Sequence, residues 1–147
     1  MGELTLPESG SVYLDSNGFI YSIERIDPYR SILDTLWLTI SAGKVKVVTS
    51  ELTLLEVLVK PLKFGDATIA TLYRTVLKHT PDVQMLPISQ NVLEAAAGLR
   101  ATLGLKTPDA IHVATALLHK STLFLTNDNA FRRIADLNVR VLSELIA

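Results

Sequence analysis

The chain has 147 residues, of which 48% are hydrophobic and 20% charged, so it is long enough to bury a core and too apolar to be disordered. Its 14 Lys and Arg residues against 15 Asp and Glu give a net charge of −1, which argues against binding a nucleic acid by bulk electrostatics. The absence of cysteine excludes disulfides and thiolate metal sites. No apolar run reaches the roughly 18 residues that span a bilayer, and the first ten residues are unlike a signal peptide, which predicts a cytoplasmic protein without a membrane partner.

Five short apolar runs have the length and the flanking turn residues of β-strands. They are residues 12–14, 45–49, 83–88, 122–126 and 139–142. Pro87 lies inside the third run. Because proline removes a hydrogen bond from the sheet, we expect this strand to lie at an edge or to end there.

The segments between these runs show helical spacing of their apolar residues. Helices are predicted over residues 30–42, 52–59, 67–78, 92–103 and 107–120. The second is apolar nearly all round and precedes Pro61, so we expect a buried helix that ends before this proline. Ser89 is a candidate N-cap for the fourth helix, and Thr107 followed by Pro108 is a typical N-cap and start for the fifth. Strands that alternate with helices predict an α/β fold, a three-layer α/β/α sandwich around a central parallel sheet, in a single domain over residues 1–147.

Acidic residues fall where such a fold places its ligand site, beyond the carboxyl ends of the strands. Asp15 directly follows the first strand, and Asp128 comes just after the fourth. Asp109 opens the helix that enters the fourth strand, so it lies at the same edge of the sheet. Glu56 is in a mostly apolar helix that leaves this edge, where an ionised glutamate is costly unless it is paired or bound to a cation.

Four carboxylates at one rim would repel one another, because two unit charges about 4 Å apart cost roughly 4 kcal/mol at an effective dielectric near 20. Such a cluster protonates, splays apart or binds a cation. Oxygen ligands without Cys or His favour Mg²⁺ or Mn²⁺. One such ion can generate a hydroxide nucleophile and neutralise a phosphoryl oxygen, and a second could stabilise the leaving oxygen. This chemistry suits phosphodiester hydrolysis, and the ion supplies the positive charge that the composition lacks.

The residues around these acids resemble those of a known family. The segments VYLDSNGFIYSIE, TSELTLLEVLVKP, LKTPDAIHVATALLH and LFLTNDNAF are together similar to the PIN-domain ribonucleases, above all to the VapC-type toxins of toxin–antitoxin pairs. The resemblance implies a Mg²⁺- or Mn²⁺-dependent endoribonuclease with a parallel sheet, a homodimer, and inhibition by a cognate antitoxin that covers the site. The catalytic and metal-binding acids that it implies are Asp15, Glu56, Asp109 and Asp128, with Asn17 and Thr126 in supporting positions.

Each acid taken alone has a simpler explanation. Asp15 could cap a following helix, and Glu56 could pair with Lys60 one helical turn away. Asp109 suits any helix N-terminus, and Asp128 could belong to a turn. The coincidence of all four favours the metal site, in which Glu56 is either a further ligand or the base that orients the attacking water.

Other residues are assigned by their setting. Glu51, in the first turn of the helix that carries Glu56, is assigned a structural role, and His112 a packing or surface role. Trp37 is assigned to the core or to a dimer interface. Candidate contacts to the substrate phosphate are Lys60, Lys106 and Arg132.

Other functions compete with the toxin reading. A housekeeping RNA-processing nuclease would use the same acids, although the chain carries no appended RNA-binding domain. A receiver-type signalling module needs adjacent acids after the first strand and a lysine after the last, and neither is present. A haloacid-type phosphatase needs Asp-x-Asp after the first strand, where Asn17 takes the second position.

Overall fold

The computed structural model describes residues 4–146. Its centre is a five-stranded sheet in the order β3-β2-β1-β4-β5, with every pair of neighbours parallel. The strands are β1 (Gly10–Leu14), β2 (Val45–Ser50), β3 (Val83–Leu86), β4 (Leu123–Thr126) and β5 (Val139–Val141). The predicted fold class is confirmed. So is the edge position of the third strand, which ends one residue before Pro87.

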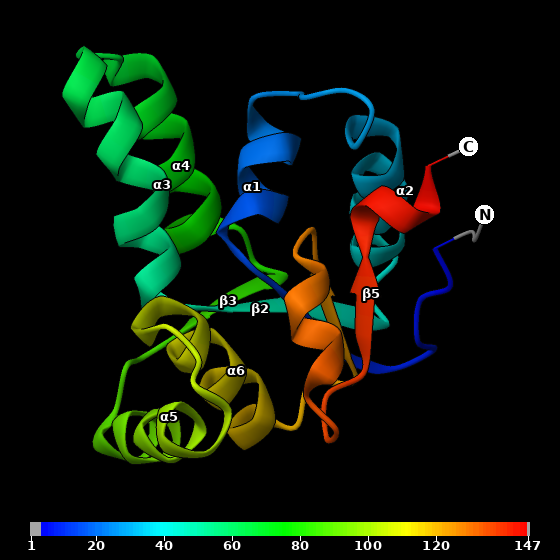
Figure 1. Cartoon of the computed structure of the whole chain (residues 1–147). Coiled ribbons are helices and arrows are strands. Elements are labelled where there is room, and N and C mark those ends of the chain that lie inside the picture. The colour runs from blue at the N-terminus through cyan, green and yellow to red at the C-terminus, as the bar shows by residue number, and fades with distance from the viewer. Residues whose placement is uncertain (1–3, 147) are drawn as a thin grey trace.

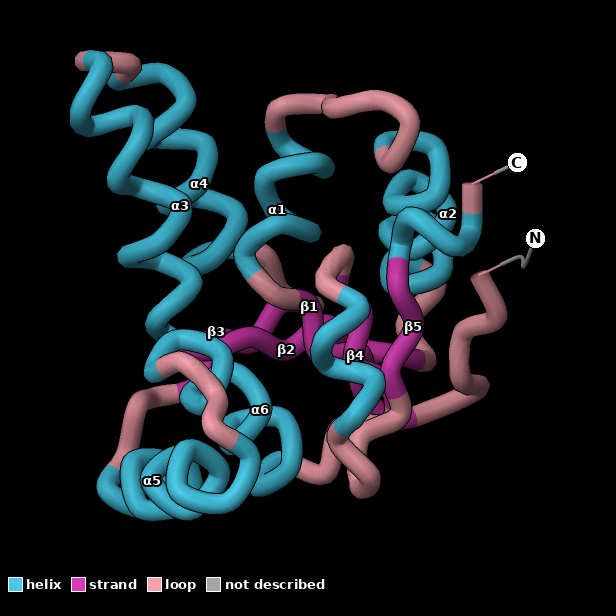
Figure 2. The backbone as a smooth tube through the Cα atoms, in the orientation of Figure 1, coloured by secondary structure: helices cyan, strands magenta, loops and turns pink. Residues whose placement is uncertain are grey.

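Helices cover both faces of the sheet and complete three layers (Figure 1). One face carries α1 (Ser16–Ile23), α2 (Arg30–Ser41), α3 (Glu51–Phe64), α4 (Ala67–His79) and the 3-10 helix η2 (Leu142–Leu145). The other face carries α5 (Gln90–Leu103), α6 (Thr107–His119) and the 3-10 helix η1 (Asn129–Arg133). Figure 2 shows the strands as a thin layer between these two groups, with the α3–α4 pair extending away from the sheet. None of the helices in the described part of the chain is both long and apolar enough to cross a bilayer.

The central strand β1 contributes to both hydrophobic cores, because successive residues of a strand point to opposite faces. Val12 and Leu14 enter the core beneath α1 to α4, whereas Tyr13 enters the core beneath α5 and α6. All three are fully buried. Leu4 and Leu6, which precede the strand, pack against the first of these cores. Leu4 and Leu6 therefore have a packing role that the sequence did not reveal.

A helix that was not predicted, α1, begins directly after β1. Asp15 is its N-cap, and Oδ1 of Asp15 accepts a hydrogen bond from the backbone N–H of Gly18 at 3.4 Å. Gly18 is buried against Leu14, so closely that an added Cβ would lie 2.2 Å from Cδ1 of Leu14. The tight connection from strand to helix therefore requires a residue without a side chain at position 18.

Helix α3 is longer than predicted, because it continues through Pro61 to Phe64. It ends at Gly65, whose φ of 71° is the left-handed conformation that commonly terminates helices. Pro61 costs one hydrogen bond within the helix, and its ring is buried.

The expectation that this helix is buried was wrong for most of its surface. One narrow face, with Thr53 and Val57, is buried. Leu55, Val59 and Leu62 are 57–61% exposed because α3 extends beyond the end of the sheet. An apolar face of α3 is thus open to solvent.

The starts of the last two long helices follow the predicted pattern closely. Oγ of Ser89 accepts a hydrogen bond from the backbone N–H of Val92 at 3.2 Å, as expected of the N-cap of α5. Helix α6 begins at Thr107 itself, with Lys106 in the cap position, one residue earlier than predicted.

Candidate active site

Asp15 lies at the carboxyl end of the central strand and is only 6% exposed. Besides the bond from Gly18, its Oδ2 accepts a hydrogen bond from Oγ1 of Thr126 at 2.6 Å. Burial raises the pKa of the Asp15 carboxyl and the charge of Glu56 adds to this shift, whereas the hydrogen bonds from Thr126 and Gly18 oppose it. A carboxylate in this setting would be stabilised by a cation.

Thr126 connects two of the predicted acids, because β4 is the neighbour of β1. Its Oγ1 donates to Asp15 and accepts a hydrogen bond from the backbone N–H of Asp128 at 3.1 Å. Asp128 in turn caps η1, since its Oδ1 accepts from the backbone N–H of Ala130 at 2.9 Å. The structure therefore brings Asp15, Thr126 and Asp128 together.

Asp109 lies in the first turn of α6 and is partly buried. Burial raises the pKa of its carboxyl, and the charges of Asp128 and Glu56 raise it further, whereas the charge of Lys106 lowers it. Asp109 is thus within electrostatic reach of two other predicted acids, although they come from distant parts of the chain.

Glu56 is held by a buried network that the sequence analysis missed. Its Oε1 lies 2.6 Å from Nε2 of His112, and Nδ1 of His112 lies 2.6 Å from the hydroxyl of Tyr13. That hydroxyl also accepts a hydrogen bond from the backbone N–H of Ser50 at 3.2 Å. The partner of Glu56 is therefore His112 rather than Lys60. His112 is buried, as a packing residue would be, but it also contacts a candidate catalytic acid.

Two features of the sequence could have pointed to this network. Tyr13 lies in the middle of an apolar strand, and a buried tyrosine usually finds a partner for its hydroxyl. His112 lies within residues 111–116, all of which are buried, and a buried imidazole needs hydrogen-bond partners. Neither feature says which partner is found.

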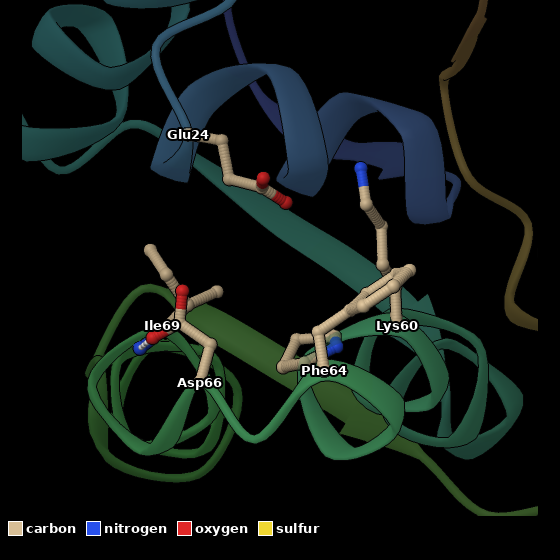
Figure 3. A pocket seen from close by; sticks show the side chains of 6 residues that line it. Glu24, Lys60, Phe64, Asp66 and Ile69 are labelled. Carbon is tan, nitrogen blue, oxygen red and sulfur yellow. Dashed lines mark hydrogen bonds between the residues drawn. The ribbon is translucent and has the colours of Figure 1, made fainter.

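The predicted phosphate contacts differ in their surroundings. Lys106 adjoins the acids, since its charge lowers the pKa of Asp109. Lys60 is exposed one turn beyond Glu56 and lines a pocket with Glu24, between α1 and the α3–α4 pair (Figure 3).

Arg132 and Asn17 are less directly placed for a role in the site. Arg132 is ion-paired with Glu144, so it could reach a phosphate only if this pair opened. Asn17 is exposed in the first turn of α1, two residues after Asp15.

Two residues set apart from the site have structural contacts. Oε1 of Glu51 accepts a hydrogen bond from the backbone N–H of Ile88 at 3.1 Å. The indole N–H of Trp37 donates to Oγ of Ser22 at 2.9 Å, and its ring packs against Phe19. Both contacts agree with the structural roles expected for Glu51 and Trp37.

The donor set of the four acids fits a hard divalent cation. Within residues 4–146, no three His, Asp or Glu side chains gather closely enough to ligate one ion together. Mg²⁺ usually needs only one or two carboxylates, because waters complete its coordination shell. Burial, the main cause of the raised pKa values of Asp15 and Asp109, disfavours their ionised forms, and a divalent cation would favour them.

Solved structures with this architecture come from several bacteria. A chain of a toxin–antitoxin complex from Klebsiella pneumoniae is 25% identical with a TM-score of 0.64, and the match covers 89% of this chain and 97% of that one. VapC20 from Mycobacterium tuberculosis, a sarcin–ricin-loop-cleaving toxin, is 16% identical with a TM-score of 0.71, over 88% of this chain and 98% of that one. FitAcB from Neisseria gonorrhoeae is 22% identical with a TM-score of 0.68, over 91% and 99%.

Comparison of the sequence with protein families shows the family. A search of curated proteins finds no match. The profile of the PIN domain, however, matches residues 12–137, from the central strand β1 to the segment before β5. Because this match covers most of the chain and includes all four acids, the protein belongs to the PIN domain family.

Proposed function

We propose that this protein is an endoribonuclease that hydrolyses RNA phosphodiester bonds with the help of Mg²⁺ or Mn²⁺, and that it is the cytoplasmic toxin of a toxin–antitoxin pair. The observation that carries the proposal is the electrostatic coupling of acids from four separate segments in a PIN domain. Membership of the family supports a nuclease. Neighbours that come from toxin–antitoxin complexes, or that cleave the sarcin–ricin loop, support the toxin role and an RNA substrate.

The four acids would divide the work between them. Of Asp15, Asp109 and Asp128, one or two would bind the ion directly and the rest through its waters, and Glu56 would be a further ligand or the base that orients the attacking water. When bound, a divalent ion supplies positive charge beside the substrate phosphate and lowers the pKa of water, so that hydroxide is available to attack the phosphorus. The protein supplies the orientation, because Asp15 is fixed by Thr126 before any substrate arrives.

One of the predicted phosphate contacts acts electrostatically on an acid of the site. Lys106 is the predicted phosphate contact that the geometry favours, because its charge acts on Asp109. We therefore infer that Lys106 helps to hold the RNA backbone and that Lys60 and Arg132 contribute less.

A protein partner is supported by the exposed apolar face of α3. Leu55, Val59 and Leu62 lie at i, i+4 and i+7 on one side of this helix, and each is more than half exposed. Contiguous exposed apolar surface typically marks a protein interaction site. A cognate antitoxin and a second copy of the chain are both candidates for covering it.

The test of the nuclease is cleavage of a labelled RNA by the purified protein with Mg²⁺, with Mn²⁺ and with EDTA. We expect cleavage with either ion and none with EDTA. Asp15→Asn should abolish it, whereas the matched change Asp136→Asn, at an exposed acid outside the site, should not. Cleavage by Asp15→Asn at the wild-type rate, or undiminished cleavage in EDTA, would refute the assignment.

Growth experiments in cells distinguish the toxin role from a housekeeping role. Induced expression should stop growth, Asp15→Asn should not, and co-expression of a small protein encoded next to this gene should restore growth. Normal growth under strong expression of a protein that cleaves RNA in vitro would favour the housekeeping nuclease.

A further inference from the structure

Tyr13, His112 and Glu56 form a chain of hydrogen bonds that runs from the interior to the rim of the site. It begins at the backbone N–H of Ser50, 3.2 Å from the hydroxyl of Tyr13, and it continues through two contacts of 2.6 Å to Oε1 of Glu56. The side chain of His112 is 4% exposed and that of Glu56 is 28% exposed. The chain thus links a fixed backbone group to a carboxylate that solvent can reach.

Hydrogen-bonding rules give this chain a direction. An ionised carboxylate can only accept, so Nε2 of His112 must carry the hydrogen that reaches Glu56. The hydroxyl of Tyr13 already accepts from Ser50, which leaves its own hydrogen free to donate to Nδ1 of His112. The neutral imidazole protonated at Nε2 satisfies all four groups at once.

Packing fixes the rings that carry these hydrogen bonds. Tyr13 stacks on Phe124 with centroids 5.0 Å apart and an interplanar angle of 4°, and these two residues are register partners of β1 and β4. His112 meets the Tyr13 ring nearly edge-on, at 5.8 Å and 74°. The imidazole is therefore aimed at Glu56 by two strands of the sheet as well as by its own helix.

We propose that His112 and Tyr13 are positioning residues for Glu56, with the Nε2–H of His112 holding Oε1 so that Oε2 faces the reacting atoms. This inference rests on the proposed nuclease function. It assigns Glu56 a role through one oxygen, as a base or as a single-oxygen ligand, rather than a two-oxygen grip on an ion. Groups that orient a metal ligand or a catalytic carboxylate in this way typically contribute 10–100-fold to activity or metal affinity.

The first test needs no activity. Long-range ¹H–¹⁵N correlation spectra of the metal-free, full-length protein report which ring nitrogen of each histidine carries hydrogen. We expect His112 in the Nε2–H form, its signals identified by their loss in His112→Gln, while the exposed His79 and His119 serve as references. Tyr13→Phe should weaken this preference while keeping the stack on Phe124. A predominant Nδ1–H form of His112, or tautomer exchange like that of His119, would overturn the proposal.

The second test is steady-state RNA cleavage by two variants at position 112. Gln at this position keeps an N–H that can reach Glu56, whereas Leu has none. We expect His112→Leu to lower kcat about 10–100-fold with little change in KM, and His112→Gln to recover most of the loss. The matched pair His119→Leu and His119→Gln, at the exposed end of the same helix, should leave kcat unchanged.

The outcomes separate this inference from the function on which it rests. Equal losses in both His112 variants, or a loss confined to KM, would overturn the positioning role. A wild-type protein that cleaves no RNA would refute the proposed function, and the NMR measurement would still decide whether His112 holds Glu56.

Discussion

Replacing Gly18 with alanine should destabilise the protein, although alanine is the better helix former. An added Cβ would lie 2.2 Å from Cδ1 and 2.4 Å from Cγ of Leu14, whereas carbon atoms in contact normally lie about 3.5–4.0 Å apart. Leu14 is fully buried in the core, so its side chain could move only by displacing the residues packed around it. Overpacking of this kind costs about 1–3 kcal/mol, more than the roughly 1 kcal/mol or less that alanine gains over glycine in a helix.

A second glycine, at an exposed position of another helix, provides the control for this prediction. Gly98 is an exposed residue of α5, and an added Cβ there would meet nothing within 4 Å. Gly98→Ala should therefore raise the free energy of unfolding by about 0.5–1 kcal/mol, while Gly18→Ala lowers it. Urea denaturation of the two variants and the wild type measures both changes. If Gly18→Ala proved as stable as Gly98→Ala, the close contact with Leu14 would be refuted.

Four more predictions concern the acids and the surface. Thr126→Val should lower the free energy of unfolding, measured by urea denaturation, by about 1–3 kcal/mol, because the hydrogen bonds to Asp15 and Asp128 are lost. Thr126→Ser should recover most of this loss, and equal losses in the two variants would contradict the role of the hydroxyl. Because burial raises the pKa of Asp15, the folded protein keeps this proton to higher pH than the unfolded chain, so ionisation costs stability as pH rises above about 4. Thermal melts in EDTA should thus show Asp15→Asn gaining on the wild type from pH 4 to pH 7, and a constant difference would be evidence against the shift. Mg²⁺ at 100 times its dissociation constant should stabilise the wild type by about 2.7 kcal/mol and Asp15→Asn by much less, whereas equal shifts in the two melts would argue against Asp15 as a ligand. Leu62→Lys should change the free energy of unfolding by no more than about 0.5 kcal/mol, because residue 62 is 61% exposed. Leu36→Ala in the core should cost about 2–5 kcal/mol. A large loss for Leu62→Lys would mean that the apolar face of α3 is covered.

The layer architecture could be predicted because it depends on patterns that are local in sequence. Apolar strand-length runs alternate with helical spacing, and such alternation leads to a parallel sheet with helices on both faces. Asp15 and Asp128 could be placed for the same reason. Asp15 directly follows β1, and Asp128 comes two residues after the end of β4. Their approach to one edge then follows from the parallel order of β1 and β4.

The errors arise where tertiary contacts override local signals. The residues Ser16, Asn17 and Gly18 are typical of a turn, yet they form the first turn of α1, which Asp15 caps and in which Gly18 packs against Leu14. Helix α3 is apolar on most sides, so its sequence cannot indicate which side meets the core. In the network at Glu56, His112 lies 56 positions from Glu56 and 99 positions from Tyr13 in the sequence. No periodicity within a segment can predict pairs at such separations.

The pairing of β1 with β4 determines when, during synthesis of the chain, the candidate site can be completed. The strand emerges early from the ribosome, yet its neighbour β4 and the hydroxyl that holds Asp15 come from a segment 111 residues later. The side chains of the candidate site therefore stay unassembled in a growing chain until β4 has been synthesised, since non-local strand pairs form only after both strands are available. The order of the strands thus delays the positioning of Asp15 until 111 further residues have been added to the chain.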